Sequence, residues 1–330
     1  MPRYVVGIDL GGTKIAAGLA AAGGQILTTA HRPTPVSSGP EGILKALVDM
    51  VDELLSAHGF GRDQLSAIGM GVPCLLETAS SICRFSPNLF WQDVDIGSFW
   101  RRHFSCPLAV DNDVRLGALA EHTWGAGQGT QDLLFVAIGT GIGSGLILNG
   151  EIYRGSRGLA GEIGHITLVS NGPRCNCGRR GCLEAYAAGP AIARRAQAAM
   201  AADKKTLLWQ LCDGKDQAIA AELVSQAADQ GDRLARQIWE DTGRFLGIGL
   251  ASVATLLNPE RIIVGGGVAQ AGDKLFRPLR QTLAERVLTV PGIDYPVLPA
   301  TLGPQTGVLG AIAAALDLLR EQERGLPEQL

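Results

Sequence analysis

A histidine and three cysteines lie close together in the second half of the sequence. His165 precedes Cys175, Cys177 and Cys182, so four side chains that commonly bind metals fall within one short segment. Three thiolates and an imidazole form a closed tetrahedral shell around zinc, with no open position for a catalytic water. The spacing therefore predicts a structural Zn2+ site. The alternative is that the cysteines bind nothing and that His165 is an ordinary loop histidine.

Two carboxylates flank the predicted zinc site. Glu162 lies three residues before His165, and Glu184 lies two residues after Cys182. A zinc ion would tie the His165 segment to the cysteine loop and hold both glutamates in place. Carboxylates accept charge-assisted hydrogen bonds from hydroxyl groups, so the pair suits the vicinal hydroxyls of a sugar.

One loop pattern occurs twice. Gly-Thr-x-Ile-x-x-Gly-Leu-x-x-x-Gly starts at Gly12 and again at Gly139, and each copy follows a strand-like apolar run, residues 4–8 and 133–138. Glycines let backbone amides curl around an anion, and the threonine hydroxyl adds a donor. Two such loops predict a polyphosphate held from both sides; two unrelated hairpins are the alternative. The predicted phosphate-loop residues are Gly11, Gly12, Thr13, Lys14, Gly139, Thr140 and Gly141.

An acidic residue stands beside the first loop. Asp9 ends the strand-like run, and Mg2+ that bridges phosphates takes one or two protein carboxylates. Asp9 is therefore predicted to serve a magnesium ion, and Lys14 to contact a phosphate; solvated side chains are the alternative for both. The loop leads into a strand and not a helix, which excludes Walker A and Rossmann loops.

A second group of polar residues follows a predicted strand at 107–110. Asp111, Asn112 and Asp113 open a helical pattern there, at the strand end where open α/β sheets place ligands. Phosphoryl transfer needs an aligned acceptor hydroxyl and a carboxylate to take its proton. Asp113 is the predicted general base, with Asn112 holding the same sugar; a helix cap is the alternative.

A third glycine turn lies near the end of the chain. The run Gly265, Gly266 and Gly267 follows the predicted strand 261–264. Without side chains the backbone can approach an adenine or ribose closely. The alternative is a tight turn between a strand and a helix.

The remaining pattern alternates strands and helices in both halves of the chain. Helical spacing covers residues 43–55, 190–202, 216–229, 232–257 and 306–319, and a further strand is predicted at 67–72. This alternation predicts two α/β domains around a cleft. We expect a smaller N-terminal domain of residues 1–120 completed by 305–330, and a larger domain of residues 121–304.

Composition and charge narrow the function. The 330 residues carry a formal net charge of -3, which gives no electrostatic case for nucleic acid or an anionic membrane. The sequence enters a strand directly, without a leader pattern, so the cytoplasm is the expected location. Clustered cysteines in a reducing compartment favour a metal over disulfides. The other four are expected to be buried small hydrophobes: Cys74, Cys83, Cys106 and Cys212.

Together these motifs resemble the ROK (repressor, open reading frame, kinase) sugar kinases. The match runs nearly end to end, and its most specific parts are Gly161–His165 and Cys175–Tyr186. The resemblance implies a two-domain actin/hexokinase-like (ribonuclease H-like) ATPase fold with a central cleft. Within the family, the sequence around Cys182 is similar to that of the glucokinases.

The resemblance also implies roles for individual residues. Asp113 would be the base, and His165 with the three clustered cysteines would bind zinc. The two glycine-threonine turns would bind phosphates and the triple glycine the adenosine. The implied sugar contacts are Asn88, Asn112, Asp113, Glu162, His165 and Glu184. For Asn88 a turn asparagine is an equal alternative. Arg115 departs from the family pattern, in which many members carry Asn two residues after the base.

The expected activity is ATP-dependent phosphorylation of glucose at its 6-hydroxyl, assisted by Mg2+. Fructose, mannose, N-acetylglucosamine or N-acetylmannosamine are alternative substrates, and a non-catalytic sugar-binding regulator is the alternative of another class. The resemblance further implies a homodimer or a higher homo-oligomer, with a small-molecule sugar as its partner and no nucleic acid or membrane.

Overall fold

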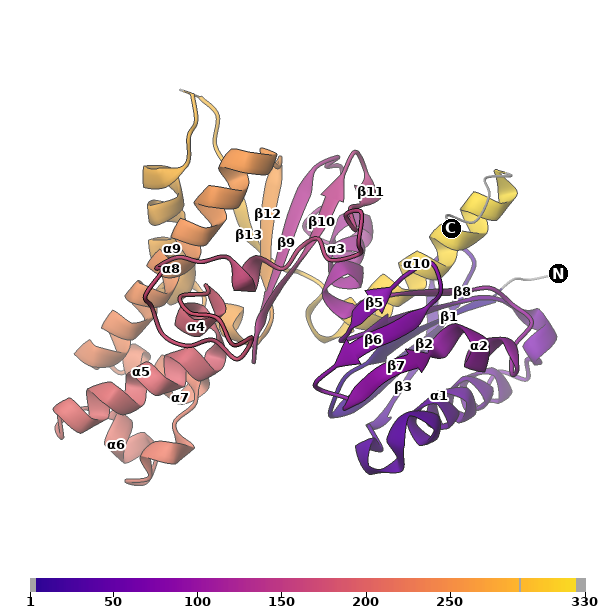
Figure 1. The fold of residues 1–330 in the computed structure, drawn as a ribbon, viewed down its shortest axis with the longest axis horizontal. Helices are drawn as coiled ribbons and strands as arrows, with labels where there is room; N and C mark the ends of the chain where they lie inside the picture. The colour runs from indigo at the N-terminus through magenta and orange to yellow at the C-terminus, as the bar shows by residue number, and fades with distance from the viewer. Residues whose placement is uncertain (1–3, 291, 325–330) are drawn as a thin grey trace. The chain divides into compact units, whose positions relative to one another are not determined.

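The computed structural model describes residues 4–290 and 292–324. The chain divides into two compact units (Figure 1). The first contains residues up to Gly129, then 145–160, and the chain from Thr301 onwards; the second contains 130–144 and 161–300. The division differs from the expected one. It adds 145–160 to the first unit, moves the boundaries, and makes the N-terminal unit the larger of the two.

The first unit is built on a mixed five-stranded sheet in the order β3-β2-β1-β4-β8. β1 (Tyr4–Leu10), β2 (Lys14–Ala21) and β3 (Ile26–Pro33) form an antiparallel meander. β4 (Leu65–Val72) and β8 (Leu108–Asn112) continue the sheet in parallel with β1. Because β1, β4 and β8 run the same way, their carboxyl ends share one edge of the sheet.

Helices cover both faces of this sheet. Along β1 the side chains alternate: Val6 and Ile8 lie in the cluster with α1 (Gly39–Ser56), and Val5 lies in the cluster with α10 (Thr306–Glu323). Glycines of β1, β2 and β4 lie directly under α10, where an added Cβ would meet Ile312, Val308 or the Ala311 carbonyl. α10 therefore packs unusually close to the sheet and completes the N-terminal unit.

Helix α3 (Asp113–Trp124) explains why residues 145–160 belong to the first unit. It packs against α10 and against β11 (Glu151–Ile152). At Gly145 in β10 (Ile142–Leu148) an added Cβ would press on Ala118 of α3. The chain downstream of Gly145 is thus held by α3.

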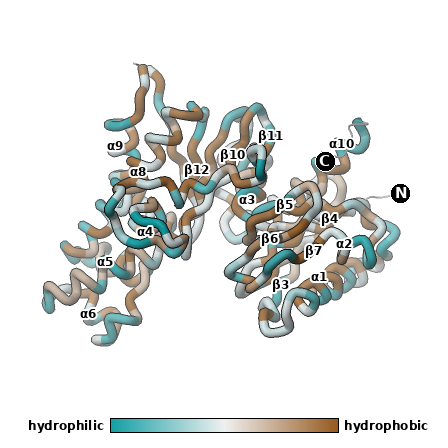
Figure 2. Tube along the Cα trace, in the orientation of Figure 1, coloured by the Kyte–Doolittle hydropathy of each residue, from teal (hydrophilic) through white to brown (hydrophobic). Residues whose placement is uncertain are grey.

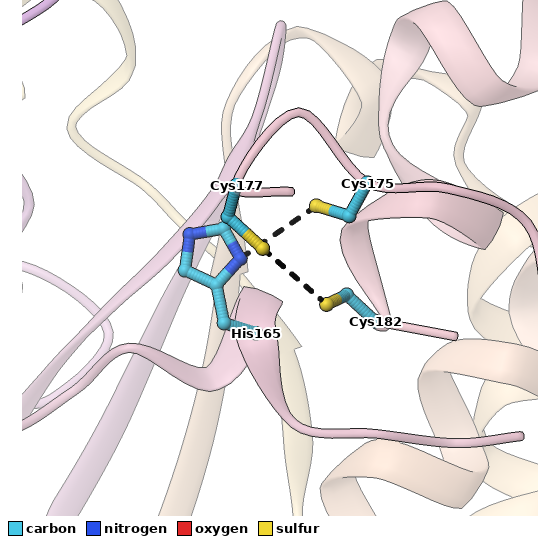
Figure 3. A group of neighbouring side chains, drawn as sticks. All are labelled: His165, Cys175, Cys177 and Cys182. Atoms are coloured by element: carbon cyan, nitrogen blue, oxygen red, sulfur yellow. Dashed lines mark hydrogen bonds between the residues drawn. The ribbon is translucent and has the colours of Figure 1, made fainter. Parts of the chain in front are cut away.

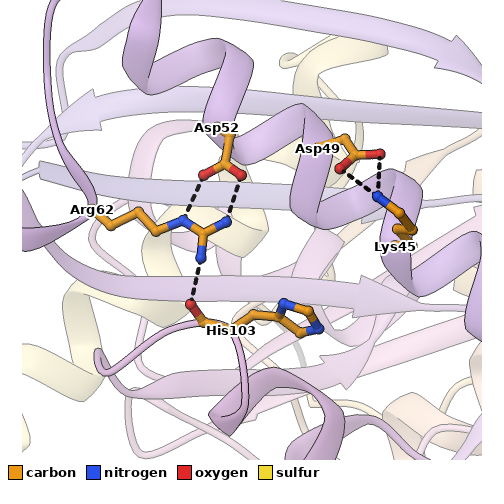
Figure 4. A network of polar contacts seen from close by, with 5 residues as sticks. All are labelled: Lys45, Asp49, Asp52, Arg62 and His103. Atoms are coloured by element: carbon orange, nitrogen blue, oxygen red, sulfur yellow. Dashed lines mark hydrogen bonds and ion pairs between the residues drawn. The ribbon is translucent and has the colours of Figure 1, made fainter.

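A three-stranded antiparallel sheet in the first unit has no counterpart among the predicted elements. It consists of β5 (Leu75–Glu77), β6 (Ile82–Ser86) and β7 (Trp91–Asp95), followed by α2 (Ile96–Arg101). On the surface nearby, Arg62 donates to both oxygens of Asp52 and to the His103 carbonyl (Figure 4). These contacts tie α1 to the loop after α2.

The second sheet has the order β11-β10-β9-β12-β13, and the boundary between the units falls inside β10. β9 (Leu133–Ile138) and β13 (Val297–Pro299) both pair in parallel with β12 (Arg261–Gly265). The strands predicted at 133–138 and 261–264 are confirmed. Both are almost entirely buried, as expected for strands covered on two faces.

The helices of the second unit are α4 (Glu184–Ala187), α5 (Gly189–Ala202), α6 (Leu208–Leu211), α7 (Ala221–Asp229), α8 (Arg233–Leu257) and α9 (Asp273–Arg286). Along the long helices, hydrophobic residues are interspersed with hydrophilic ones (Figure 2), and in α8 the buried residues recur at helical spacing. The prediction at 216–229 was too long, since only a short 3-10 turn precedes Ala221. Within the described ranges, no helix is long and apolar enough to cross a membrane.

Three of the four cysteines outside the cluster are buried as predicted, and Cys106 is only partly buried.

Candidate functional site

The predicted base lies at the junction of β8 and α3. Asn112 is the helix N-cap, and its Oδ1 accepts hydrogen bonds from the backbone N–H groups of Val114 at 3.0 Å and Arg115 at 3.3 Å. Asp113 is the first helical residue, and its Oδ1 accepts from the Val114 N–H at 3.0 Å. The helix-cap interpretation therefore describes Asn112 well. It does not exclude catalysis by Asp113, whose half-buried carboxylate is fixed at the start of a helix.

The first glycine turn brings Gly12 and Asn88 together. The turn closes when Gly11 N–H donates to the Lys14 carbonyl at 2.9 Å, and the Thr34 hydroxyl donates to the Gly11 carbonyl at 2.7 Å. A Cβ on Gly12 would press on the Asn88 carbonyl. The Asn88 loop thus lies against the backbone of the predicted phosphate loop.

Asp9 occupies the end of β1 in an environment that disfavours its charge. Burial raises the pKa of its carboxyl above the ordinary value, and Lys14 opposes that rise. The carboxylate also lies against the first turn of α10, where a Cβ on Gly307 would collide with it. The contact with Gly307 was missed by sequence reasoning, because the two residues lie at opposite ends of the chain.

The second glycine turn is held by the start of α4 and α5. Gly139 N–H donates to the Gly141 carbonyl at 2.9 Å, and Gly189 N–H donates to the Gly139 carbonyl at 2.8 Å. Glu184 Oε2 accepts from the Ile142 N–H at 3.0 Å. Glu184, expected to contact a sugar, thus has one oxygen engaged by the loop that follows Thr140.

The four predicted metal ligands converge (Figure 3). The ligand atoms of His165, Cys175, Cys177 and Cys182 all lie within 4.8 Å of one another. His165 Nδ1 is 3.8 Å from Cys175 Sγ, and Cys177 Sγ is 3.7 Å from Cys182 Sγ. Three sulfurs and one nitrogen around a common point fit a tetrahedral zinc ion.

The backbone of the cysteine loop creates this arrangement. Cys175 N–H donates to the Arg179 carbonyl at 2.8 Å, and Gly178 N–H returns to the Cys175 carbonyl at 3.0 Å. Gly178 has a φ of +87°, which favours glycine. Burial raises the pKa of the Cys175 thiol to about 12, whereas a backbone hydrogen bond from Arg179 lowers the pKa of the exposed Cys177 thiol.

Glu162 belongs to the same segment as His165. It precedes a 3-10 turn at Ile163–His165, and its carbonyl accepts from the His165 N–H at 3.0 Å. The segment is anchored on β10, because the Gly161 carbonyl accepts hydrogen bonds from both the backbone N–H and the hydroxyl of Ser144. Glu162 is exposed, so it is accessible to a ligand.

The triple glycine serves packing at two of its three positions. Gly266 has a φ of +85° and its backbone lies against the Ile138 carbonyl, whereas Gly265 lies between Ala300 and Phe135. A Cβ on Gly267 would meet nothing within 4 Å. The chain then forms a 3-10 turn before α9, which begins only at Asp273.

The predicted site residues therefore form two local groups. In the first unit these are Asp9, Gly11, Gly12, Thr13, Lys14, Asn88, Asn112 and Asp113. In the second they are Gly139, Thr140, Gly141, Glu162, His165, Cys175, Cys177, Cys182, Glu184, Gly265, Gly266 and Gly267. Each group combines carboxylates with a glycine-threonine turn.

Comparison with curated proteins finds kinases and regulators. The chain is 36% identical over 311 residues to a glucokinase of Halalkalibacterium halodurans, which covers 93% of each protein. It is 34% identical to a glucokinase of Streptomyces coelicolor, over 96% of this chain and 98% of that protein. The xylose repressor of Bacillus subtilis is 30% identical, over 95% of this chain and 77% of the repressor.

Solved structures give the same family. A ROK family glucokinase from Streptomyces griseus in complex with glucose and AMPPNP is 34% identical, with a TM-score of 0.81 over 95% of this chain and 99% of that one. The ROK hexokinase from Thermus thermophilus is also 34% identical, with a TM-score of 0.82 over 96% and 99%.

The family model described as "ROK family" matches residues 5–318 of this chain. The expected two-domain actin/hexokinase-like α/β fold is confirmed by the solved relatives. The chain belongs to the ROK family.

Proposed function

We propose that this chain is an ATP-dependent hexokinase that phosphorylates glucose at its 6-hydroxyl. The observation that carries the proposal is the placement of Asp113 and Asn112 at the β8–α3 junction, at the sheet edge where Asp9 is the last residue but one of β1. Relatives named glucokinase match nearly the whole chain, and one of them binds glucose and an ATP analogue.

Asp113 would act as the general base. Its carboxylate would take the proton of the sugar 6-hydroxyl as that oxygen attacks the γ-phosphorus of ATP in line, and ADP would leave. Asn112 would hold the same sugar from the adjacent position. Glu162 and Glu184 would accept hydrogen bonds from the ring hydroxyls. His165, whose Nδ1 faces the cysteines, would donate one from its Nε2–H to a ring oxygen.

The two glycine turns would bind the phosphates, with their amides and the hydroxyls of Thr13 and Thr140 as donors. The residues fit Mg2+ at Asp9, because a nearby cation would offset the burial that raises the pKa of this carboxyl. Mg2+ would supply charge neutralisation on the transferred phosphoryl group. Gly267, with open space beside it, is the position of the triple glycine best suited to approach the adenosine.

The residues also fit structural Zn2+. Its donor set of one imidazole and three thiolates leaves no open coordination position, so zinc would hold the Glu162 and Glu184 segments and take no part in phosphoryl transfer.

A regulator that binds sugar without turning it over is the second candidate. The similarity to xylose repressors, which extend beyond the matched region, favours it. A carboxylate at position 113 and another at position 9 favour the kinase, because sugar binding alone requires neither a base nor a metal ligand.

The test is an ADP-coupled assay with saturating MgATP and five sugars: glucose, mannose, fructose, N-acetylglucosamine and N-acetylmannosamine. We expect the highest kcat/KM for glucose, because the buried polar groups of a matched site penalise an analogue that leaves one unpaired. If another sugar exceeded glucose tenfold, the enzyme would be a kinase of that sugar. Binding of glucose without ADP release would support the regulator.

The cytoplasmic location and the homodimer remain predictions from sequence. Light scattering at micromolar concentration would test the latter, and the mass of a monomer would overturn it.

A further inference from the structure

Asp111, the residue before the sugar-binding pair, is a buried carboxylate shared by two arginines. It is only 2% exposed. Its Oδ1 accepts the Asn112 backbone N–H at 2.7 Å and lies 3.0 Å from Arg115 Nε, and its Oδ2 lies 2.7 Å from Arg154 Nε. We call Asp111, Arg115 and Arg154 the charge network.

Stability alone does not account for Arg115. The residue is 4% exposed, and among the described residues none accepts a hydrogen bond from its enclosed Nη1. A guanidinium donor buried without an acceptor is unfavourable. A buried ion pair is often no better for stability than well-packed apolar side chains of the same size. The cost of burying the network therefore calls for a role other than stability.

The network holds the segment that carries the proposed base. The Arg115 backbone N–H donates to the Asn112 side chain, while the Arg115 side chain pairs with Asp111, which in turn accepts the Asn112 N–H. Asn112 is thus held at its amide and at its side chain by the same two neighbours. Asp113 lies between Asn112 and Arg115, so these contacts restrain its backbone.

Arg115 and Asp113 also share a neighbouring group. Both act on the buried Cys74 thiol, whose pKa is raised mainly by a hydrogen bond with Cys83 and by burial; Asp113 raises it further and Arg115 lowers it. Arg154 approaches from outside α3, on the segment that follows β11. The guanidinium groups of Arg115 and Arg154 and the carboxylate of Asp111 thus lie where β8 ends and α3 begins.

We propose that Arg115 is a positioning residue for phosphoryl transfer, which acts through Asp111 and with Arg154 to fix Asn112 and Asp113. The inference rests on the proposed function, in which Asp113 is the base. Displacing a base by a fraction of an ångström slows the chemical step more than it weakens binding of the sugar. The network should therefore influence kcat and leave the affinity for glucose nearly unchanged.

The test compares Arg115→Met, Arg115→Lys, Arg154→Gln, Asp111→Asn and the double variant Asp111→Asn/Arg115→Met. For each, kcat comes from the ADP-coupled assay, the Kd for glucose from calorimetry, and Tm from thermal unfolding. We expect Arg115→Met to lower kcat about 10- to 100-fold, with the Kd for glucose changed less than about threefold. Arg115→Lys should recover part of the loss, and Arg154→Gln should lose less than Arg115→Met.

The double variant separates positioning from general damage. If Arg115 acts through Asp111, the double variant should lose little more kcat than the worse single variant, because residues that act as a unit are non-additive. Arg195→Met is the matched control. Arg195 also carries an enclosed nitrogen without a partner among the described residues, but it binds α8 through Ile238 and Thr242. That variant should lower Tm and keep kcat within about twofold.

The outcomes separate this inference from the proposed function. If Asp113→Asn abolishes turnover but the Arg115 and Arg154 variants keep wild-type kcat, the positioning role is wrong and the base assignment stands. If Asp113→Asn keeps turnover, both are wrong. If Arg115→Met fails to fold, Arg115→Lys and the partly exposed Arg154→Gln decide: unchanged kcat in both overturns the inference.

Discussion

The two glycine-threonine hairpins share a sequence pattern but differ in the carboxylates beside them. Each turn is closed by a hydrogen bond from the backbone N–H of a glycine. In the first copy this is Gly11, just before the pattern, and in the second it is Gly139, the first residue of the pattern. In both, the later glycine of the pattern lies under a helix: Gly18 under Val308 of α10, and Gly145 under Ala118 of α3. The repeated residues therefore specify the turn and the site of helix packing.

The carboxylate beside each turn comes from a different place. In the first hairpin it is Asp9, which its own strand supplies and whose pKa is raised by burial. In the second it is Glu184 of α4, which accepts the Ile142 N–H. A poorly satisfied carboxylate suits a metal ion, whereas one that is hydrogen-bonded to the loop stabilises the loop. We therefore expect the first hairpin to bind a metal ion and the second to present a rigid set of hydrogen-bond donors.

The largest difference between the hairpins should appear when each carboxylate is replaced by its amide. Asp9→Asn should lower kcat by about 10²- to 10³-fold, the cost of losing one preorganised electrostatic contact. Glu184→Gln should mainly raise the KM for MgATP, because it loosens the second phosphate loop. Steady-state kinetics with varied MgATP and glucose would measure both. Equal losses of kcat would contradict the division of roles.

The second hairpin should also depend on the metal site that holds Glu184. Cys177→Ala should lose the zinc and lower Tm by about 10 °C or more, because structural metal binding contributes directly to folding. Elemental analysis and thermal unfolding would measure the two effects. Cys212→Ala, a buried cysteine outside the cluster, is the control that should keep its zinc. Wild-type protein with less than about half an equivalent of zinc would count against the site.

The threonines occupy the same place in both copies of the pattern. Thr13→Ala and Thr140→Ala should each raise KM for ATP about tenfold, the value of one hydrogen bond to a charged group. Both threonines are exposed, so Tm should hardly change. An effect of only one substitution would show that only one hairpin contacts the phosphates.

The smallest effect expected is on stability, and its sign is opposite to that on activity. Burial raises the pKa of Asp9 in the folded protein, so its contribution to stability is lost as pH rises from its ordinary value of 3.8 through the raised value. Asp9→Asn carries no charge and should have a slightly higher Tm than wild type at pH 7. The difference should vanish below about pH 4. Asp294→Asn, at an exposed aspartate, should show no such gain.

Sequence alone predicted the parts of the fold that local patterns specify. The strands and turns of both hairpins follow from apolar runs next to glycines, and the His165–Cys182 cluster follows from ligand spacing. The sheet of β5, β6 and β7 was missed because its strands are very short. Ser81, Phe90 and Asp93 there adopt positive φ, which no glycine signals.

The rest of the site depends on contacts between distant residues. Arg154 pairs with Asp111 across 43 positions, and Gly307 of α10 reaches Asp9 of β1. Neither contact leaves a pattern in the sequence, because each partner is an ordinary residue in its own segment. Only the folded sheet and the packing of α10 and α3 bring them together.

The most direct test of the account is the turnover of Asp113→Asn. The amide keeps the shape of the side chain but cannot take a proton. We predict that kcat falls at least about 10²-fold, while calorimetry shows glucose binding within a fewfold of wild type and thermal unfolding shows an intact fold. Turnover close to wild type in this variant would contradict the central claim that Asp113 is the base.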